Sequence, residues 1–200
     1  MPKDAFFKLK ENKKEKIMLA ARAEFSNAKY DDVSINDIVK KSGISRGSFY
    51  LYFEDKLDIY AHLLRCTFTS IRKRMDEAVK RGNNIFFAFL DVYDYIILEN
   101  ATPESVGFLA KILNEISPDS YMKIYKSIGI GRDKEYLRKY CFPLEHFTIQ
   151  DDFEFDILNR HLIMLLTSHL TKVLVNKEDP QKVRDELRIT YNMIKYGVYR

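Results

Sequence analysis

Apolar side chains recur at intervals of three or four residues along most of the chain, and this spacing is typical of helices with one buried face. The period predicts helices near residues 11–27, 34–41, 45–52, 55–81, 84–99, 103–116, 118–128, 134–142, 151–174 and 180–199. Strand signals are weak, because no alternating run lies beside an Asn-Gly or Asp-Gly turn. The pattern therefore predicts an all-α fold.

Several of the predicted helices begin at a capping residue. Thr102-Pro103 and Asp179-Pro180 each pair a side-chain acceptor with a proline, which suits the first turn of a helix. Asp151 is followed three residues later by Glu154, as in a capping box. The 84–99 segment is apolar on almost every side, so we expect it to be deeply buried.

The segment Ser34–Phe53 has the residues expected of two short helices joined by a tight turn. Ser34 can cap the first helix, and Asp37 lies three residues further on, where it can reciprocate. Gly43 lies where the chain must turn, because glycine accepts a left-handed conformation without steric cost. Ser45 then caps the second helix. The sequence thus predicts a helix-turn-helix.

The second short helix has an unusual outer face. It carries small residues, hydroxyl groups and one guanidinium, at Ser45, Arg46, Gly47, Ser48, Tyr50 and Tyr52. Small residues let a helix enter the major groove of DNA, hydroxyl groups bond phosphates or base edges, and an arginine can bond both acceptors of a guanine. Phe49 and Phe53, four residues apart, are expected to face the core. The outer face predicts contact with double-stranded DNA.

Lys56 follows at the start of the next helix, where a cation is poorly placed for the helix dipole. A phosphate contact would explain this lysine, since the start of that helix also offers free amide donors. The alternative for the whole segment is that Gly43 only ends a helix and that the tyrosines pack in the core. The glycine turn and the outer face occur together, and this combination favours contact with DNA.

The same residues resemble the N-terminal signature of the TetR (tetracycline-repressor-like) family of transcriptional regulators. The resemblance rests on Ile17, Ala21 and Phe25 at intervals of four, on Ile38, on the run Gly43–Phe53 and on Lys56. It covers residues 11–60, about a quarter of the chain. Two positions differ from the usual pattern, because Lys29 replaces a glycine after the first long helix and Val39 replaces an alanine.

The resemblance implies a three-helix DNA-binding domain at residues 1–56 and a larger helical domain for ligand binding and dimerisation at residues 57–200. It implies that Ser34 and Asn36 contact the DNA backbone and that Lys56 grips a phosphate. The reading helix would contact DNA through Ser45, Arg46, Gly47, Ser48, Tyr50, Leu51 and Tyr52. The protein is then expected to be a ligand-responsive transcriptional regulator, most often a repressor in this family, and not an enzyme.

The resemblance also implies that the last two long helices pair with their copies in a homodimer. Two motifs can then address the two half-sites of a near-palindromic operator. The candidate interface residues are Ile157, Met164, Leu187, Tyr191 and Ile194. The alternative is that the apolar stripes of both helices cover only the core of one monomer.

Aromatic side chains are abundant in the second predicted domain. A pocket lined by aromatic and a few polar groups suits a flat or hydrophobic small molecule. The candidate ligand-binding residues are Phe89, Tyr93, Phe108, Asn114, Tyr125, Arg160 and His161. The alternative is that these side chains pack in the core. An unknown small-molecule effector is expected to change the angle of the 55–81 helix and weaken operator binding.

The net charge of +4 is too small to establish a nucleic-acid partner. A second hypothesis is a non-specific or architectural DNA-binding protein whose N-terminal lysines contact phosphates. Those lysines are Lys8, Lys10, Lys13, Lys14 and Lys16. The alternative for this arm is a solvated, partly disordered tail. A third hypothesis, a small-molecule carrier or an enzyme, lacks a nucleophile–base motif or a phosphate-binding glycine loop to support it.

The two cysteines, Cys66 and Cys141, are far apart in the sequence, which favours a reducing compartment. His62 and Cys66 have a spacing that can share a metal, but two ligands do not make a site, so we expect neither a metal nor a cofactor. The chain has no signal-peptide pattern and no apolar run long enough to span a bilayer. We therefore expect a soluble cytoplasmic protein without membrane contact.

Overall fold

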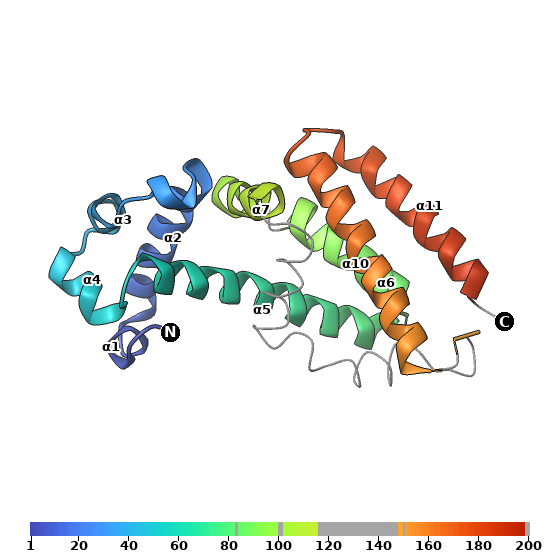
Figure 1. Ribbon diagram of the computed structural model, residues 1–200, viewed down its shortest axis with the longest axis horizontal. Helices are drawn as coiled ribbons and strands as arrows, with labels where there is room; N and C mark the ends of the chain where they lie inside the picture. Colours follow the sequence, from blue (N-terminus) through green and yellow to red (C-terminus); the bar gives the residue numbers. More distant parts are fainter. Residues whose placement is uncertain (83, 100–101, 116–147, 150, 199–200) are drawn as a thin grey trace. The chain divides into compact units, whose positions relative to one another are not determined.

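The computed structural model describes residues 1–82, 84–99, 102–115, 148–149 and 151–198, and every regular element in these ranges is helical, which confirms the predicted all-α class (Figure 1). The elements are α1 (Asp4–Phe7), α2 (Glu11–Asn27), η1 (Tyr30–Asp32), α3 (Ile35–Ser42), α4 (Arg46–Tyr52), α5 (Lys56–Gly82), α6 (Ile85–Asp94), η2 (Tyr95–Glu99), α7 (Pro103–Glu115), α10 (Asp152–Leu174) and α11 (Pro180–Val198). The helices predicted near 118–128 and 134–142 lie outside the described residues.

Side-chain caps set the starts of several helices where the sequence predicted them. The Thr102 hydroxyl accepts a hydrogen bond from the amide of Ser105 at 3.2 Å, and the Asp179 carboxylate accepts one from the amide of Lys182 at 2.7 Å. Asp151 accepts in the same way from the amide of Glu154. Each bond satisfies an amide that has no partner within its helix.

Two elements differ from the prediction. The segment predicted as one helix over residues 84–99 is α-helical only to Asp94 and continues as η2, a π-helical turn. The second difference is α1, a single helical turn near the N-terminus. No helix was predicted there, and one interpretation of this arm was a partly disordered tail. α1 has one buried side chain, Phe6, and this contact with the core gives the arm a defined structure.

The first of two compact units comprises residues 1–67 and 102–112. Its core forms where α2 packs on α3, with Ile17, Ala21, Phe25 and Ile38 at most 2% exposed. Burial of an aliphatic or aromatic side chain contributes about 1.5–3 kcal/mol. The α2–α3 contact is therefore a main source of stability for this unit.

The first part of α7 also belongs to this unit. The Ser26 hydroxyl on α2 lies 2.9 Å from the carbonyl oxygen of Glu104, and a Cβ at Gly107 would lie only 3.0 Å from the Cβ of Ser26. The small residues allow the two helices to approach closely. The unit thus extends beyond the predicted domain end at residue 56 and includes a segment distant in sequence, 102–112.

The second unit is built from the remaining part of α5 with α6, α10 and α11. α10 and α11 form an antiparallel pair (orange to red in Figure 1), and both pack on α6. The Tyr191 hydroxyl donates to the carbonyl oxygen of Leu162 at 3.1 Å, and the Tyr93 hydroxyl donates to that of Pro180 at 2.7 Å. Burial raises the pKa of both phenols, that of Tyr93 to about 12, so both remain protonated donors.

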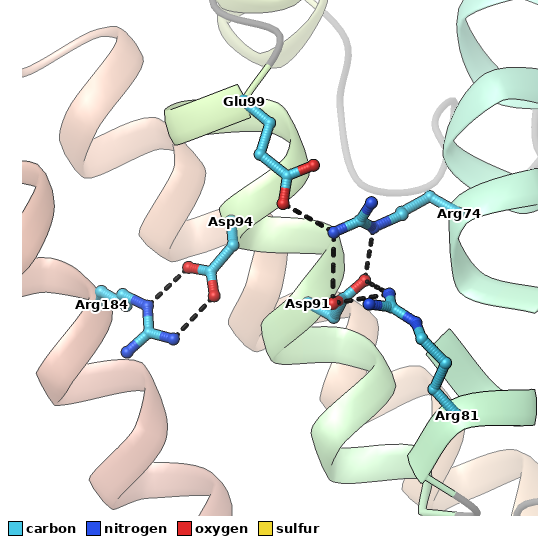
Figure 2. Close-up of polar contacts among 6 residues, drawn as sticks. All are labelled: Arg74, Arg81, Asp91, Asp94, Glu99 and Arg184. Atoms are coloured by element: carbon cyan, nitrogen blue, oxygen red, sulfur yellow. Dashed lines mark hydrogen bonds and ion pairs between the residues drawn. The ribbon is translucent and has the colours of Figure 1, made fainter. Parts of the chain in front are cut away.

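A network of arginines and carboxylates holds α6 to its neighbours in the second unit (Figure 2). Asp91 is buried and accepts hydrogen bonds from Arg74 and Arg81 of α5, the latter at 2.8 Å. Asp94 accepts from Arg184 of α11, with an Nη2–Oδ2 distance of 2.6 Å. Each arginine has a carboxylate partner, which offsets the cost of removing these charges from water.

None of the helices in the described ranges is long and apolar enough to cross a membrane.

Replacing Asp91 tests the contribution of this network. Asp91→Asn is expected to lower the free energy of unfolding by about 1–3 kcal/mol, because it weakens the charged hydrogen bonds that Asp91 accepts from Arg74 and Arg81, while Glu99 stays 2.7 Å from Arg74. Urea unfolding followed by circular dichroism measures the change, since the chain has no tryptophan. The control is Glu77→Gln, at a half-exposed side chain 4.0 Å from Lys73, with an expected change below about 0.5 kcal/mol. Equal losses in the two variants would contradict this account.

Candidate nucleic-acid interface

The turn between α3 and α4 has the geometry that the sequence predicts. Ser34 caps α3 by accepting a hydrogen bond from the amide of Asn36, and Ser45 caps α4 by accepting one from the amide of Ser48, both at 3.0 Å. Gly43 ends α3 with φ +71° and ψ +27°, in the left-handed region. Its amide bonds the carbonyl of Lys40, and the next amide bonds that of Val39, which is the Schellman arrangement.

The inner face of α4 is fixed by aromatic packing. Phe49 and Phe53 are fully buried, with ring centroids 5.4 Å apart, as predicted from their spacing. Tyr52 also faces inward and is 8% exposed, with its ring 6.4 Å from that of Phe6. The placement of Tyr52 on the outer face is therefore wrong, and its tyrosine ring packs in the core as the alternative reading proposed.

The outer face of α4 is open to solvent. Its exposed residues include Ser45, Arg46, Gly47, Tyr50 and Leu51, and Ser48 is half-buried. The Arg46 guanidinium donates a hydrogen bond to the side-chain oxygen of Asn36 at 2.9 Å and lies 5.9 Å from the centre of the Tyr50 ring. These two contacts hold the arginine in one orientation on the surface.

A shallow groove of about 250 Å³ lies beside this face. It is lined by Val33, Ser34, Ile35, Asn36, Arg46 and Lys56. The groove thus combines the first residues of α3 with two cationic side chains. The positive end of the α3 dipole adds to these two charges, so the electrostatic potential in the groove favours an anion.

Lys56 has partners that the sequence did not indicate. Its ammonium donates to the carbonyl oxygens of Tyr30 at 2.7 Å and Asp31 at 3.0 Å, and it lies 4.6 Å from the centre of the Tyr30 ring. Burial, followed by the charges of Asp55 and Asp31, raises the pKa of the Tyr30 phenol, so the ring stays neutral. In this structure Lys56 ties η1 to the start of α5, which explains a cation at this position without a phosphate.

Two residues at the other end of α4 were missed by the sequence reasoning. Lys3 donates from its backbone amide to the carbonyl of Tyr52 and from its ammonium to the carbonyl of Tyr50. Phe6 packs its ring 4.9 Å from that of Phe53. The sequence signal for this contact was Phe6 itself, an aromatic residue in an arm otherwise rich in charged residues.

The lysines of the second hypothesis lie on α2 and on the residues just before it. Lys8, Lys10, Lys13 and Lys16 are exposed, whereas Lys14 pairs with Glu11 at 3.0 Å. Contact of these lysines with phosphates stays a prediction.

The predicted ligand-binding residues are divided between the two units. Phe108 is buried in the first unit, where its ring lies 5.9 Å from that of Tyr60. Phe89 and Tyr93 are buried in the second unit, in which Asn114, Arg160 and His161 are exposed. Tyr125 lies outside the described residues. A ligand pocket formed by these residues stays a prediction.

The predicted dimer residues also differ in exposure. Leu187 and Tyr191 are buried in the second unit, so these two side chains serve the core of one protomer, as the alternative proposed. Ile157 and Met164 are exposed on α10, and Ile194 is half-buried on α11. The prediction omitted four further exposed apolar side chains of α10 and α11, which are Phe153, Ile189, Met193 and Tyr196.

His62 and Cys66 lie close together, with Nε2 and Sγ 3.7 Å apart. Burial lowers the pKa of His62 and raises that of the Cys66 thiol. A protonated thiol is a poor metal ligand. No group of three metal-ligating side chains occurs within the part of the chain that the structure describes.

The two glycines of the motif provide a matched test of its geometry. Gly43→Ala is expected to cost about 1–2 kcal/mol, because an alanine at φ +71° is strained even though the space around it is open. Gly47→Ala is expected to stabilise the protein by up to about 1 kcal/mol, because Gly47 is helical and the nearest atom to its added Cβ is 3.9 Å away. Thermal unfolding of both variants tests whether the melting temperature falls for Gly43→Ala and rises for Gly47→Ala. Equal shifts in the same direction would rule out the assigned turn.

Comparison with known proteins places this geometry in a family. Residues 17–63 match the family described as "Bacterial regulatory proteins, tetR family", a range that runs from α2 into α5. The HTH-type transcriptional regulator YdgC of Bacillus subtilis (strain 168) is 38% identical over 60 residues. This match covers 30% of the chain, which spans only 31% of the length of that relative.

Two longer matches extend beyond the DNA-binding motif. IcaR of Staphylococcus aureus (strain Newman), named as the HTH-type negative transcriptional regulator of the biofilm operon icaADBC, is 36% identical over 138 residues, which are 61% of this chain and 74% of that protein. The crystal structure of a TetR family transcriptional regulator from Chloroflexus aurantiacus J-10-FL shares the fold, with a TM-score of 0.58 and 21% identity over 100% of this chain and 99% of that one. Together with the helix-turn-helix geometry, these matches show that the chain belongs to the TetR family of transcriptional regulators.

Proposed function

We propose that this protein is a repressor that binds a near-palindromic operator in double-stranded DNA as a homodimer and releases it when a small-molecule effector binds. The observation that carries the proposal is the division of α4 into two faces. Phe49 and Phe53 lock the inner face in the core, while Arg46 and Gly47 lie on the exposed outer face. A short helix of this kind can present a fixed surface to the major groove.

The residues of the outer face suit close approach to DNA. Gly47 has no side chain, so the α4 backbone can come near the base edges. Arg46 can donate to both acceptors of a guanine. Its hydrogen bond to the Asn36 side-chain oxygen already limits its conformations in the free protein, so less conformational entropy is lost on binding DNA. The positive end of the α3 dipole, with the Arg46 guanidinium beside it, suits a phosphate in the adjoining groove.

A homodimer is supported by apolar side chains left in solvent on α10 and α11. Ile189, Met193 and Tyr196 are exposed at positions i, i+4 and i+7, so they form one stripe along α11. On α10, Ile157 and Met164 are exposed in the same way. Exposed apolar stripes of this kind mark protein interfaces, and the same face on a second copy would cover them.

Repression and the effector rest on family relationships. IcaR is named as a negative transcriptional regulator, which favours repression over activation. TetR-family regulators in general bind DNA as dimers with small-molecule effectors. The second unit of this chain lies outside the DNA-binding motif, so we assign effector binding to it.

Selection of DNA by the purified protein tests the central proposal. From a pool of random-sequence duplexes, the wild-type protein is expected to enrich a near-palindromic sequence. Arg46→Ala is expected to bind the enriched duplex about 10–100-fold more weakly, because one arginine–guanine pair contributes about 1–3 kcal/mol of discrimination. Gly47→Ala is expected to bind it more weakly as well, although the folded protein is more stable. Fluorescence anisotropy measures the affinities.

The control for the arginine is Lys80→Ala, which removes one exposed positive charge at the end of α5. Its affinity for the enriched duplex is expected to equal that of the wild type. If the pool yields no preferred sequence and Arg46→Ala binds all duplexes as well as the wild type does, the lysine-based, non-specific hypothesis replaces this one.

Sedimentation of an α11 variant tests the dimer. Met193 is 71% exposed in the middle of the α11 stripe, and Met193→Asp would bury two carboxylates at a symmetric interface. The wild type is expected to sediment as a dimer and Met193→Asp as a monomer at the same concentration. Leu19→Asp, at an exposed apolar residue of α2, is the control and is expected to remain dimeric. A monomeric wild type would refute the dimer.

A further inference from the structure

The short helix α1 depends on contacts outside itself. Four residues make a single turn, and an isolated turn is unstable in water. Phe6 supplies the main contact, because it is 2% exposed and its ring lies 4.9 Å from Phe53 and 5.4 Å from His62. α1 is therefore anchored on Phe53, the residue directly after α4, and on His62 of α5.

The last turn of α4 depends in turn on α1. The final four carbonyls of a helix have no partner within it, and α4 has only seven residues. Lys3 supplies two donors to this end, its backbone amide to Tyr52 O at 2.8 Å and its ammonium to Tyr50 O at 3.0 Å. A positive charge at this end of a helix is also favourable for the helix dipole.

We propose that α1 is a clasp that positions the DNA-reading helix α4, with Lys3 and Phe6 as its positioning residues. This inference rests on the proposed DNA-binding function. Ser45 fixes the first turn of α4 and Phe49 fixes its inner face, so the clasp fixes the remaining end. Base recognition requires accurate placement of the side chains on the helix, whereas contacts to the phosphate backbone tolerate small displacements.

The clasp differs from a direct contact between Lys3 and DNA. The Lys3 ammonium already bonds the Tyr50 carbonyl and lies 3.1 Å from the Glu54 carboxylate. Loss of a phosphate contact weakens binding to every duplex and lowers the salt dependence of binding by about one counterion. Loss of the clasp weakens binding to the preferred sequence and leaves the salt dependence unchanged.

The test uses Lys3→Met, which keeps the length of the side chain and removes the ammonium, together with Phe6→Leu and the restoring variant Lys3→Arg. The probes are the duplex enriched by the wild-type protein and a mixed-sequence duplex, with affinities measured over a range of salt concentrations. Amide hydrogen exchange without DNA follows the Phe53 amide, which bonds Phe49 O at 2.8 Å in the last turn of α4.

Lys3→Met is expected to bind the enriched duplex about tenfold more weakly, with unchanged affinity for the mixed duplex and an unchanged salt slope. Exchange at Phe53 is expected to become faster. Phe6→Leu is expected to act in the same direction, and Lys3→Arg to restore both properties. Lys80→Met, which removes an exposed lysine of α5, is the matched control and is expected to behave as the wild type.

Two results would overturn the clasp. The first is weaker binding of Lys3→Met to both duplexes with a smaller salt slope, which would make Lys3 a phosphate contact. The second is unchanged exchange at Phe53 in both Lys3→Met and Phe6→Leu. Failure of the wild type to enrich any duplex would refute the proposed function instead. Hydrogen exchange at Phe53, measured without DNA, would still test whether α1 stabilises the last turn of α4.

Discussion

The burial of Phe49 and Phe53 is the constraint on which the candidate interface depends. A helix of seven residues cannot keep its shape in water by its own hydrogen bonds, so α4 exists because these two rings are held in a core. α4 packs on both α1 and α3, and α3 leads into α4 through the left-handed turn at Gly43. Once the inner face is fixed, the residues of the outer face have no core contact to make, and their chemistry is available for a partner.

The sequence predicted this part of the fold well because its signals are local. The caps at Ser34 and Ser45, the glycine between them and the period of apolar residues all act within a few positions, so they can be recognised from the sequence alone. The positions of Tyr52, Lys56 and α1 depend on residues distant in sequence. Lys56 bonds carbonyls of Tyr30 and Asp31, and Phe6 meets Phe53, and no local pattern contains these pairings.

The second unit shows why the exposed face of an apolar helix is harder to predict than its buried face. An apolar period identifies a stripe, but α11 carries two apolar groups that lie on different faces. Leu187 and Tyr191 face the protomer core, while Ile189 and Met193 remain exposed. Asp91, a buried charge of this unit, is paired with two arginines within the protomer (Figure 2), whereas the exposed apolar stripe of α11 would be covered only in the proposed dimer.

Backbone amide NMR of the protein titrated with its enriched duplex tests the central claim most directly, because it reports which residues meet DNA without any substitution. The account predicts that the largest shifts occur at Ser45–Leu51 on α4 and at Asn36 on α3, where the exposed face and the groove lie. Shifts confined to the lysine-bearing start of α2, with α4 unchanged, would contradict it.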